Sequence, residues 1–235
     1  MIIRIATKED WKSISNLSRI SGYSDWINDT GIEFLESGYT MVAEGEGILG
    51  FAKAEDAGDG SMWLSALRVH PSHRRRGIGE DITKFALELA KKRGSKFARM
   101  FVEPSNHKSI NLVKKLGFEF REDYSIFCGS IDTSGWQLSN LEEDVYVGAG
   151  WAFVRLKDYG LSDLSVKERE GVKVIEKDRP NNNAFQTIII SGELKMLSVT
   201  NSGYVAVPSK WQDQVAKFLK PFEDFAAASL FELKI

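Results

Sequence analysis

The sequence predicts an α/β protein in two parts, a first domain over residues 1–132 and a smaller α+β domain over residues 133–235. Three observations support this fold class. Strand-like and helix-like segments alternate in the first part, a basic glycine-rich loop joins one such strand to a helix, and mainly strand-like segments fill the second part. A chain of 235 residues is also long enough for two domains.

Each element of the first domain has a local signal. After an opening strand-like stretch, Thr7 and Asp10 form a T-x-x-D helix-start signal, a variant of the capping box. Residues 40–55 are typical of two strands joined by a tight Gly-Glu-Gly turn. We then expect a strand over 63–71, a strand over 96–104 and a helix after residue 105. Between those two strands, a helix packs one apolar face on the sheet, formed by Ile78, Ile82, Phe85, Ala86, Leu89 and Ala90.

The second part is predicted to consist mainly of strands, at residues 144–156, 172–177, 184–190, 193–199 and 203–208. Ser191 and Gly192 fit the turn of a hairpin between two of them. Ser209 and Gln212 form an S-x-x-Q helix-start signal. A helix then follows, divided by Pro221, with an aromatic face made of Trp211, Val215, Phe218, Leu219, Phe222 and Phe225. The final strand-like stretch, SLFELKI, completes this small domain or extends the first sheet.

The segment HRRRGIGED at residues 73–81 carries the clearest chemical signal. Arg74, Gly77 and Gly79 fall in the spacing Arg-x-x-Gly-x-Gly between a strand and a helix. Such a loop directs successive backbone N–H groups into one concavity at a helix N-terminus, where the helix dipole and unpaired donors favour a phosphate. Glycine is needed because a Cβ would block close approach of a pyrophosphate.

Three other kinds of loop share part of this pattern. A dinucleotide-binding loop would require a third glycine where Ile82 stands, and a Walker-type loop would end in Gly-Lys-Ser/Thr, which is absent. A basic surface turn or a nucleic-acid patch remains open on the Arg-Arg-Arg-Gly run alone.

The arrangement resembles the GCN5-related N-acetyltransferase (GNAT) family, whose pyrophosphate signature is Gln/Arg-x-x-Gly-x-Gly/Ala between a strand and a helix. The resemblance covers roughly residues 1–130 and includes the later N-x-x-A-x-x-L-Y-x-K-x-G-F block. Five positions of that block match, namely Asn106, Leu112, Lys115, Gly117 and Phe118. The resemblance implies the acyl-CoA N-acyltransferase fold, a mixed and mostly antiparallel sheet flanked by helices.

The resemblance also implies acetyl-CoA as cosubstrate. The backbone of Leu67 and Val69 would pair with the pantetheine arm as though the ligand were an added strand. Asn106 would cap the next helix and contact the cofactor arm, beside the small Ser109. The pyrophosphate would lie on the backbone of Arg74, Arg75, Arg76, Gly77, Ile78, Gly79 and Glu80.

The catalytic groups are less clearly marked. Many family members have a proton-donating tyrosine at the position of Val113, so the leaving thiolate lacks that acid here. Glu103 is the first candidate for the general base and Glu55 follows, with Asp56 and His70 behind them. Each could instead be a solvated charge at a strand end. Residues 23–26, Tyr-Ser-Asp-Trp, lie in a region that lines the acceptor pocket in this family, or form a loop with a buried tryptophan.

Composition narrows the functional classes. The 31 Lys plus Arg balance 33 Asp plus Glu, which argues against a dedicated nucleic-acid binder. The single cysteine, Cys128, permits no intrachain disulfide, and no histidine or cysteine follows it, so we expect no metal site. We find neither a signal peptide nor a membrane-spanning run, and expect a cytoplasmic protein with no membrane partner.

Two functions remain open from the sequence. The first is an acetyl-CoA-dependent N-acetyltransferase acting on a primary amine of a small molecule or a protein. The second is a catalytically silent acyl-CoA-binding regulatory module, which the valine at position 113 slightly favours. The region over 133–235 could be a degenerate second GNAT-like half, an acceptor-recognition domain or a homodimer contact, and it has no Arg-x-x-Gly-x-Gly spacing of its own.

Overall fold

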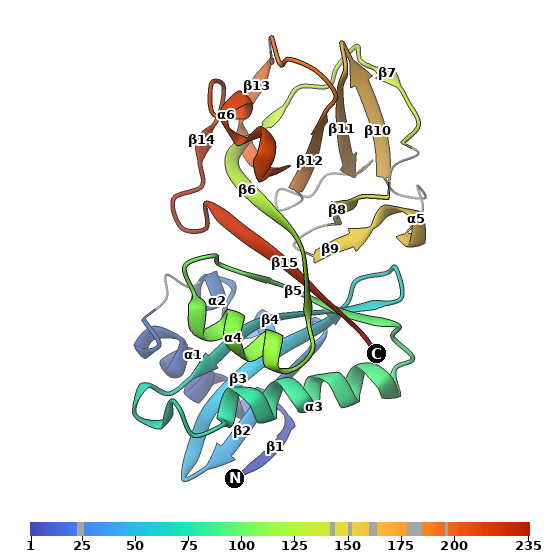
Figure 1. Cartoon of the computed structure of the whole chain (residues 1–235). Helices are drawn as coiled ribbons and strands as arrows, with labels where there is room; N and C mark the ends of the chain where they lie inside the picture. Colours follow the sequence, from blue (N-terminus) through green and yellow to red (C-terminus); the bar gives the residue numbers. More distant parts are fainter. Residues whose placement is uncertain (23–25, 142–143, 150–151, 160–163, 178–184, 196) are drawn as a thin grey trace.

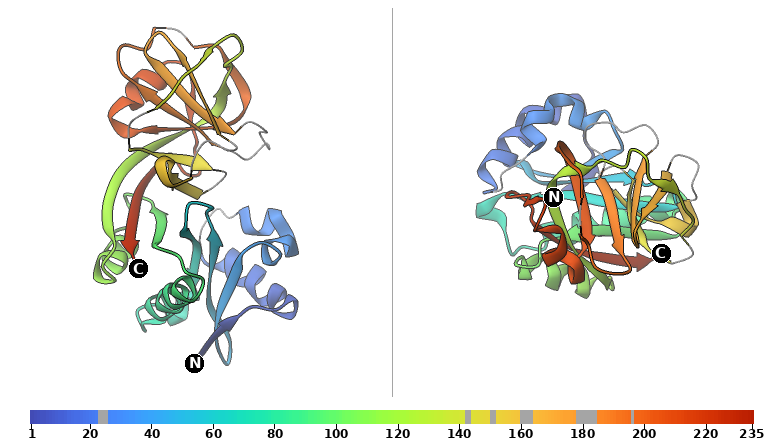
Figure 2. Two further views of the ribbon diagram at one scale, coloured as in Figure 1. Left: turned by 90° about the vertical axis from the view of Figure 1, so that its right-hand side faces the viewer. Right: turned by 90° about the horizontal axis from the view of Figure 1, so that it is seen from above.

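A long mixed β-sheet runs through the molecule, and helices cover both faces of its N-terminal half (Figure 1, Figure 2). The computed structural model describes residues 1–22, 26–141, 144–149, 152–159, 164–177, 185–195 and 197–235. None of the helices in these ranges is long and apolar enough to cross a membrane.

The N-terminal half follows the predicted element order closely. The capping box at the start of the first helix is present, because the Thr7 backbone N–H donates to Asp10 Oδ2 at 2.8 Å. The elements are β1 (Ile2–Ile5), η1 (Lys8–Asp10), α1 (Trp11–Ile20), α2 (Trp26–Thr30), η2 (Gly31–Leu35), β2 (Tyr39–Gly45), β3 (Gly47–Asp56), β4 (Ser61–Val69), η3 (Pro71–His73), α3 (Ile78–Lys92), β5 (Phe97–Val102), α4 (His107–Lys115) and β6 (Glu119–Ile131).

The C-terminal half is richer in strands. Its described elements are β7 (Gln137–Leu138), β8 (Tyr146–Ala149), β9 (Ala152–Arg155), α5 (Leu156–Tyr159), β10 (Leu164–Arg169), β11 (Val172–Lys177), β12 (Phe185–Ile190), β13 (Val199–Pro208), η4 (Ser209–Trp211), α6 (Gln212–Val215), β14 (Lys220–Pro221) and β15 (Ala227–Lys234). The strand expected over 144–156 is two short strands, β8 and β9, that pair antiparallel, and β10 was not anticipated.

The last strand, β15, is inserted among the strands of the N-terminal half. Along the sheet the order is β1-β2-β3-β4-β5-β15-β6-β13-β12-β11-β10-β7, with β14 paired to β6 beside this path. Strand β15 therefore lies between β5 and β6 and pairs antiparallel with both (Figure 1). Of the two alternatives predicted for the final strand-like stretch, the structure has the second, in which it extends the first sheet.

Two further expectations for the second half are wrong. No hairpin forms around Ser191, because β12 pairs parallel with β13 instead. In the connection between them, Leu194 and Leu197 are buried, and the Leu194 N–H bonds the Gln214 side chain at 2.7 Å rather than a neighbouring strand. The helix expected to run through residue 225 ends at Val215. Beyond it the chain extends, and Pro221 pairs with β6.

The apolar interior is divided by the sheet. One cluster packs α3 and α4 on one face of the first half, and a second packs α1, α2 and η2 against the opposite face of β2 and β3. A third cluster joins the halves, because it contains Trp63 and Tyr124 of the first half together with Phe153 and Phe185 of the second. The two halves thus share one core, and burial of such rings contributes a few kcal/mol each.

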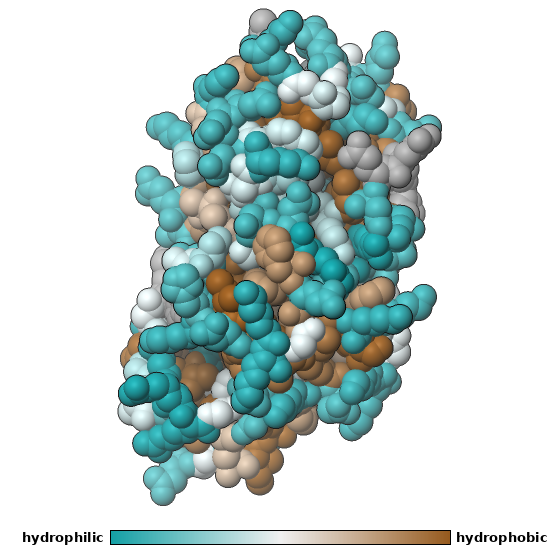
Figure 3. Space-filling model, viewed as in Figure 1, coloured by the Kyte–Doolittle hydropathy of each residue, from teal (hydrophilic) through white to brown (hydrophobic). Residues whose placement is uncertain are grey.

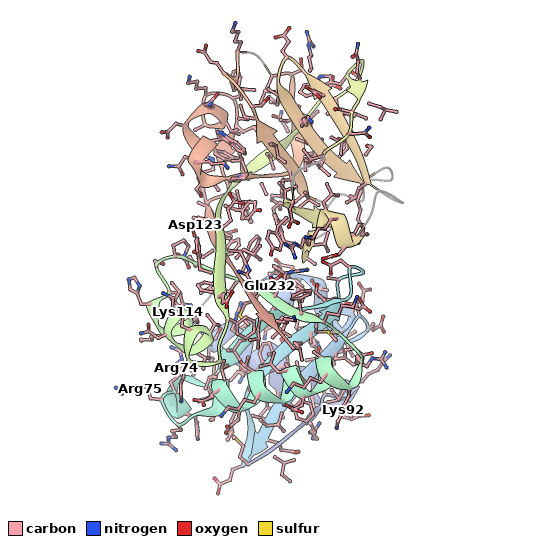
Figure 4. The ribbon with its side chains drawn as sticks, turned by 45° about the vertical axis from the view of Figure 1, so that its right-hand side comes forward. Arg74, Arg75, Lys92, Lys114, Asp123 and Glu232 are labelled. Carbon is pink, nitrogen blue, oxygen red and sulfur yellow. The ribbon has the colours of Figure 1, made fainter. Side chains whose placement is uncertain are left out.

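A buried ionic cluster holds β15 in place. The Arg99 side chain on β5 has no solvent exposure and pairs with Asp59 from the β3–β4 turn and with Glu232 on β15, the latter at 2.5 Å from Nε to Oε2. Figure 4 shows Glu232 near the middle of the molecule, on β15, where this strand runs beside β5. Arg121 on β6 adds a second contact to the same carboxylate at 3.0 Å. Loss of one member of such a cluster would leave a buried charge without its counterion.

We predict that the chain without residues 227–235 loses cooperative thermal unfolding, because β5 and β6 lose their shared neighbour and Arg99 loses Glu232. The matched control is Glu232→Gln, which keeps the strand and should cost about 3–5 kcal/mol as a broken buried pair. Near-UV circular dichroism during a melt measures both. A truncated chain that unfolds cooperatively at the wild-type temperature would contradict the structural role assigned to β15.

Candidate functional site

The basic glycine loop connects β4 to α3, in the predicted order of strand, loop and helix. Gly77 is the N-cap residue of α3 and adopts the left-handed conformation, with φ of 81°, and Arg75 has a φ of 64°. At the helix start, the N–H groups of Ile78 and Glu80 have no partner among the described residues, and neither has that of Gly79. Three free backbone donors at a helix N-terminus form a site for an anionic group.

The three arginines of the loop have different roles in the structure. Arg75 and Arg76 are exposed, and Figure 4 shows the Arg75 side chain pointing away from the ribbon. Arg74 turns back toward the protein, where Nη2 donates to the Ser21 carbonyl at 2.6 Å and Nε donates to the Val69 carbonyl at 3.2 Å. Arg74 therefore joins the loop to the end of α1, while the other two leave their charge in solvent. Polar side chains also cover much of the surface around α3 (Figure 3).

Glu80 contributes its backbone to the loop but directs its carboxylate away from it. Lys115 on α4 donates to Glu80 Oε2 at 2.5 Å, and Lys84 pairs with Oε1 at 2.9 Å. The hydrogen bond from Lys115, followed by that from Lys84, lowers the pKa of Glu80 to about 2. The ion pairs connect α3 to α4, and they compensate a negative charge that would otherwise lie beside the proposed phosphate site.

Beside this loop, one edge of β4 has no neighbouring strand within the described part of the chain. Strand β4 pairs with β5 only from Ser61 to Trp63, and the two parallel strands then diverge. A bulge follows in β4, where Ala66 has a φ of 55° and the pairing with β3 shifts register. Leu67 and Val69 lie on this diverging segment, where their carbonyls accept from the side chains of Arg68 at 3.1 Å and Arg74 at 3.2 Å. An added extended chain would take the place of these arginine contacts.

Gly79 faces the same free edge. A Cβ on Gly79 would lie 3.6 Å from the side chains of Leu67 and Val69, and 3.7 Å from that of Leu112 on α4. These are ordinary contact distances, so alanine fits at Gly79 and the expectation that this position needs glycine is not met, whereas a larger side chain would have to displace these neighbours. The edge of β4, the start of α3 and the face of α4 therefore meet at Gly79.

Helix α4 places the other residues expected at the cofactor. Asn106 is its N-cap, and the side-chain oxygen accepts from the Ser109 N–H at 3.1 Å, as its position in the sequence predicts. Ser109 is half-buried in the first turn. Val113 is buried in the core cluster under α3 and α4, with 3 % exposure, so its side chain serves packing in this chain.

The structure separates the candidate general bases. Glu103 is exposed just after β5, on the side where β4 and β5 diverge, and accepts from Ser105 Oγ at 2.7 Å. Glu55 lies opposite Trp63 in the sheet, and Ser37 Oγ donates to it at 3.1 Å. Asp56 is the next residue and is exposed.

His70 directly follows β4, and its Nδ1 lies 2.8 Å from Ser72 Oγ in the turn before the arginines. The residues Tyr23, Ser24 and Asp25 lie outside the described ranges. The neighbouring Trp26 is half exposed rather than buried, and it packs edge-on against Phe34.

Sequence reasoning missed the buried Arg99 cluster described above. The available signal was a charged residue in the middle of each of two apolar strands, Arg99 in KFARMFVEP and Glu232 in SLFELKI. Opposite charges at such positions indicate strands that pair with one another. Within the described part of the chain, no group of three or more histidine, cysteine or acidic side chains is placed to hold a metal ion.

Known proteins resemble this arrangement. The sequence model of the acetyltransferase (GNAT) family matches residues 8–118. An uncharacterised N-acetyltransferase from Methanocaldococcus jannaschii is 43 % identical over 54 residues, which is 23 % of this chain and 24 % of that protein. A Bacillus subtilis protein, provisionally described as a ribosomal protein bS18 alanine N-acetyltransferase, is 27 % identical over 127 residues, covering 50 % of this chain and 80 % of its own length.

The likeness in fold extends further than the family match. A crystal structure from Thermoplasma acidophilum, described as an acetyltransferase, superposes with a TM-score of 0.62 and covers all of both chains, at 17 % identity. The added strands of the C-terminal half are therefore shared with another solved structure of this fold. The matched part spans about a quarter of the length of the Methanocaldococcus jannaschii relative.

We predict that Glu80→Gln lowers stability in a pH-dependent way. A carboxyl whose pKa falls from 4.5 to about 2 on folding stabilises the fold above about pH 4.5, and this contribution is lost as the pH falls toward 2. The deficit of the variant in urea unfolding should be present at pH 7 and should shrink at pH 3. The control is Glu88→Gln, which removes a pair with Lys91 inside α3. Equal deficits for both variants at both pH values would contradict the bridge between α3 and α4.

We predict different effects for two arginines of the same loop. Arg74→Ala should lower the stability of the ligand-free protein by about 1 kcal/mol, because two hydrogen bonds to backbone carbonyls are lost. Arg76→Ala, at an exposed position, should change the stability of the ligand-free protein by no more than about 0.5 kcal/mol. Thermal melts without ligand measure the difference. An equal loss for both variants would show that the contact of Arg74 with α1 carries no stability.

Proposed function

Because residues 8–118 of this chain belong to the acetyltransferase (GNAT) family, we propose that the protein transfers the acetyl group of acetyl-CoA to the primary amine of a small molecule or a protein. One observation carries the proposal. The free edge of β4 ends at the three unpaired N–H groups of Ile78, Gly79 and Glu80. An extended amide chain with a pyrophosphate at one end fits that combination of a strand edge and an anion site.

Each part of the site has a role toward this cosubstrate. The backbone from Arg74 to Glu80 holds the pyrophosphate, and the exposed charges of Arg75 and Arg76 attract it. The backbone of Leu67 and Val69 pairs with the amides of the arm. The small residues Gly79 and Ser109 leave the arm room between α3 and α4. Bound acetyl-CoA supplies the activated thioester.

The protein then has to position an amine. One proton leaves the amine nitrogen, and the departing thiolate can take up another. The amine nitrogen attacks the thioester carbonyl, the C–N bond forms and the C–S bond breaks. A base takes the proton that the nitrogen gives up. The exposed position of Glu103 just after β5 supports this role for it, and Glu55 is the second candidate. Val113 has no proton to give, so the thiolate leaves without that acid. Positioning of the amine and stabilisation of the oxyanion supply much of the acceleration.

One observation favours a second candidate function. Val113 is buried in the core, so the tyrosine hydroxyl of many relatives has no counterpart at that position. A chain that binds acetyl-CoA without transferring the acetyl group would regulate a partner through its occupancy. Thiol release distinguishes the two functions, because only the enzyme produces free CoA in the presence of an amine.

We predict that acetyl-CoA at a hundredfold excess over its dissociation constant stabilises the protein by about 2.7 kcal/mol, and that amines then cause thiol release. Gly79→Ala should keep both properties, since its Cβ meets its neighbours at 3.6 Å or more. Gly79→Leu should lose both, because the side chain fills the space beside β4. Thermal melts and a thiol assay over a panel of amines measure this. Full stabilisation of the leucine variant would contradict the site, and stabilisation without thiol release would support the silent module.

A further inference from the structure

Two half-buried aromatic rings and a carboxylate lie at the C-terminal end of β5. Phe101 stands two residues beyond Arg99, the last β5 residue that pairs with β4, so it lies where the two strands have begun to diverge. Phe225 comes from the turn before β15, and its ring centroid is 6.3 Å from that of Phe101. Glu103 follows directly after β5 and is exposed. Figure 1 places the turn before β15 beside the segment that leads from β5 to α4.

These rings lie on the face of the sheet that an acceptor can reach. The opposite face is filled by α3 and α4, where Ala98, Met100 and Val102 of β5 pack into a core with Val113. Phe101 alternates with them and belongs to the cluster on the other face. A cosubstrate arm along the edge of β4 lies in the plane of the sheet. A second substrate must therefore approach its thioester from the side of Phe101.

The C-terminal half fixes the position of the Phe101 ring. Phe153 on β9 is fully buried and lies 4.5 Å from Phe101 between ring centroids, and Trp63 on β4 contacts Phe101 edge-on at 5.3 Å. Tyr124 also belongs to this group of rings, and its ring centroid lies 4.8 Å from that of Phe153. A ring held on several sides keeps its remaining surface in one place, which is what recognition of a flat or apolar group requires.

Resting on the proposed function, we propose that the acceptor is a primary amine on an aromatic or apolar carbon skeleton, and that Phe101 and Phe225 bind this skeleton. The amino group then lies toward Glu103. Aromatic faces attract an ammonium ion before it gives up its proton, and the carboxylate favours the same charge. The C-terminal half thus contributes directly to acceptor selection, because Phe225 belongs to it and Phe153 supports Phe101.

The test uses the full chain and three probes, measured by isothermal titration calorimetry. They are CoA itself and two thioether conjugates in which carboxymethyl-CoA is joined through an amide to ethylamine or to 2-phenylethylamine. The phenylethyl conjugate should bind the wild-type chain at least tenfold more tightly than the ethyl conjugate. Phe225→Ala should reduce this ratio to less than threefold while leaving the affinity for CoA unchanged. Phe120→Ala is the matched control, since it removes a half-exposed phenyl ring that packs on Phe231 at the other face.

Two outcomes would overturn the inference. Equal binding of both conjugates to the wild-type chain would show that no apolar skeleton is recognised there. If the ratio of the two conjugate affinities is unchanged in Phe225→Ala, or falls equally in Phe120→Ala, the apolar skeleton is recognised elsewhere. If CoA itself does not bind, the proposed function fails first, so the two failures are distinguishable.

Discussion

The fold depends on one buried charge. Arg99 has no solvent exposure, and its guanidinium is balanced by two carboxylates that lie far from it in sequence, Asp59 and Glu232. An arginine buried in a sheet is tolerated only when such partners are present, because desolvation of an isolated charge costs several kcal/mol. The β3–β4 turn, β5 and the end of the chain must therefore assemble together. Arg99 is also the last residue of β5 that pairs with β4, so this cluster lies at the point where those strands begin to diverge.

The position of β15 gives the sheet an approximate two-fold order. Counted from one edge of the sheet, the strands of the first half are β1 to β5, and counted from the other edge, those of the second half are β7, β10, β11, β12 and β13. The two central strands are exchanged between the halves, because β15 lies beside β5 and β6 lies beside β13. In each half a single parallel pair, β4–β5 or β12–β13, interrupts an otherwise antiparallel arrangement. Such an order is the pattern that a degenerate second half of the same fold would leave.

The two halves nevertheless differ where a cosubstrate would bind. In the first half, β4 and β5 are connected through the basic glycine loop and α3. In the second, the connection from β12 to β13 buries Leu194 and Leu197 in the core, and the Arg-x-x-Gly-x-Gly spacing does not recur in the sequence. The second half instead contributes rings to the face opposite α3. A line of aromatic contacts runs from Trp63 through Phe101 and Phe153 to Phe185. One half therefore contains the basic glycine loop, and the other covers the neighbouring face.

The sequence by itself determined the elements of the first half and the local chemistry of the loop. The spacing of Gly77 and Gly79, the capping box at Thr7 and the cap at Asn106 are set by residues a few positions apart, and local signals describe them fully. Only the tertiary structure decided which strands are neighbours. The two arginine partners of Glu232, Arg99 and Arg121, lie more than a hundred residues away, and the register of β15 places Glu232 opposite Arg99.

Local patterns failed where distant contacts decided the conformation. The aromatic spacing from Trp211 to Phe225 fits a helix, yet the rings of Phe222 and Phe218 pack into different cores, which no single helix face can reach. The turn signal at Ser191 fits a hairpin, yet Leu194 is buried in a core cluster and the chain crosses over before β13, which pairs parallel with β12. Periodicity reports which face of a segment is apolar. Which core receives that face is settled by packing between segments far apart in the chain.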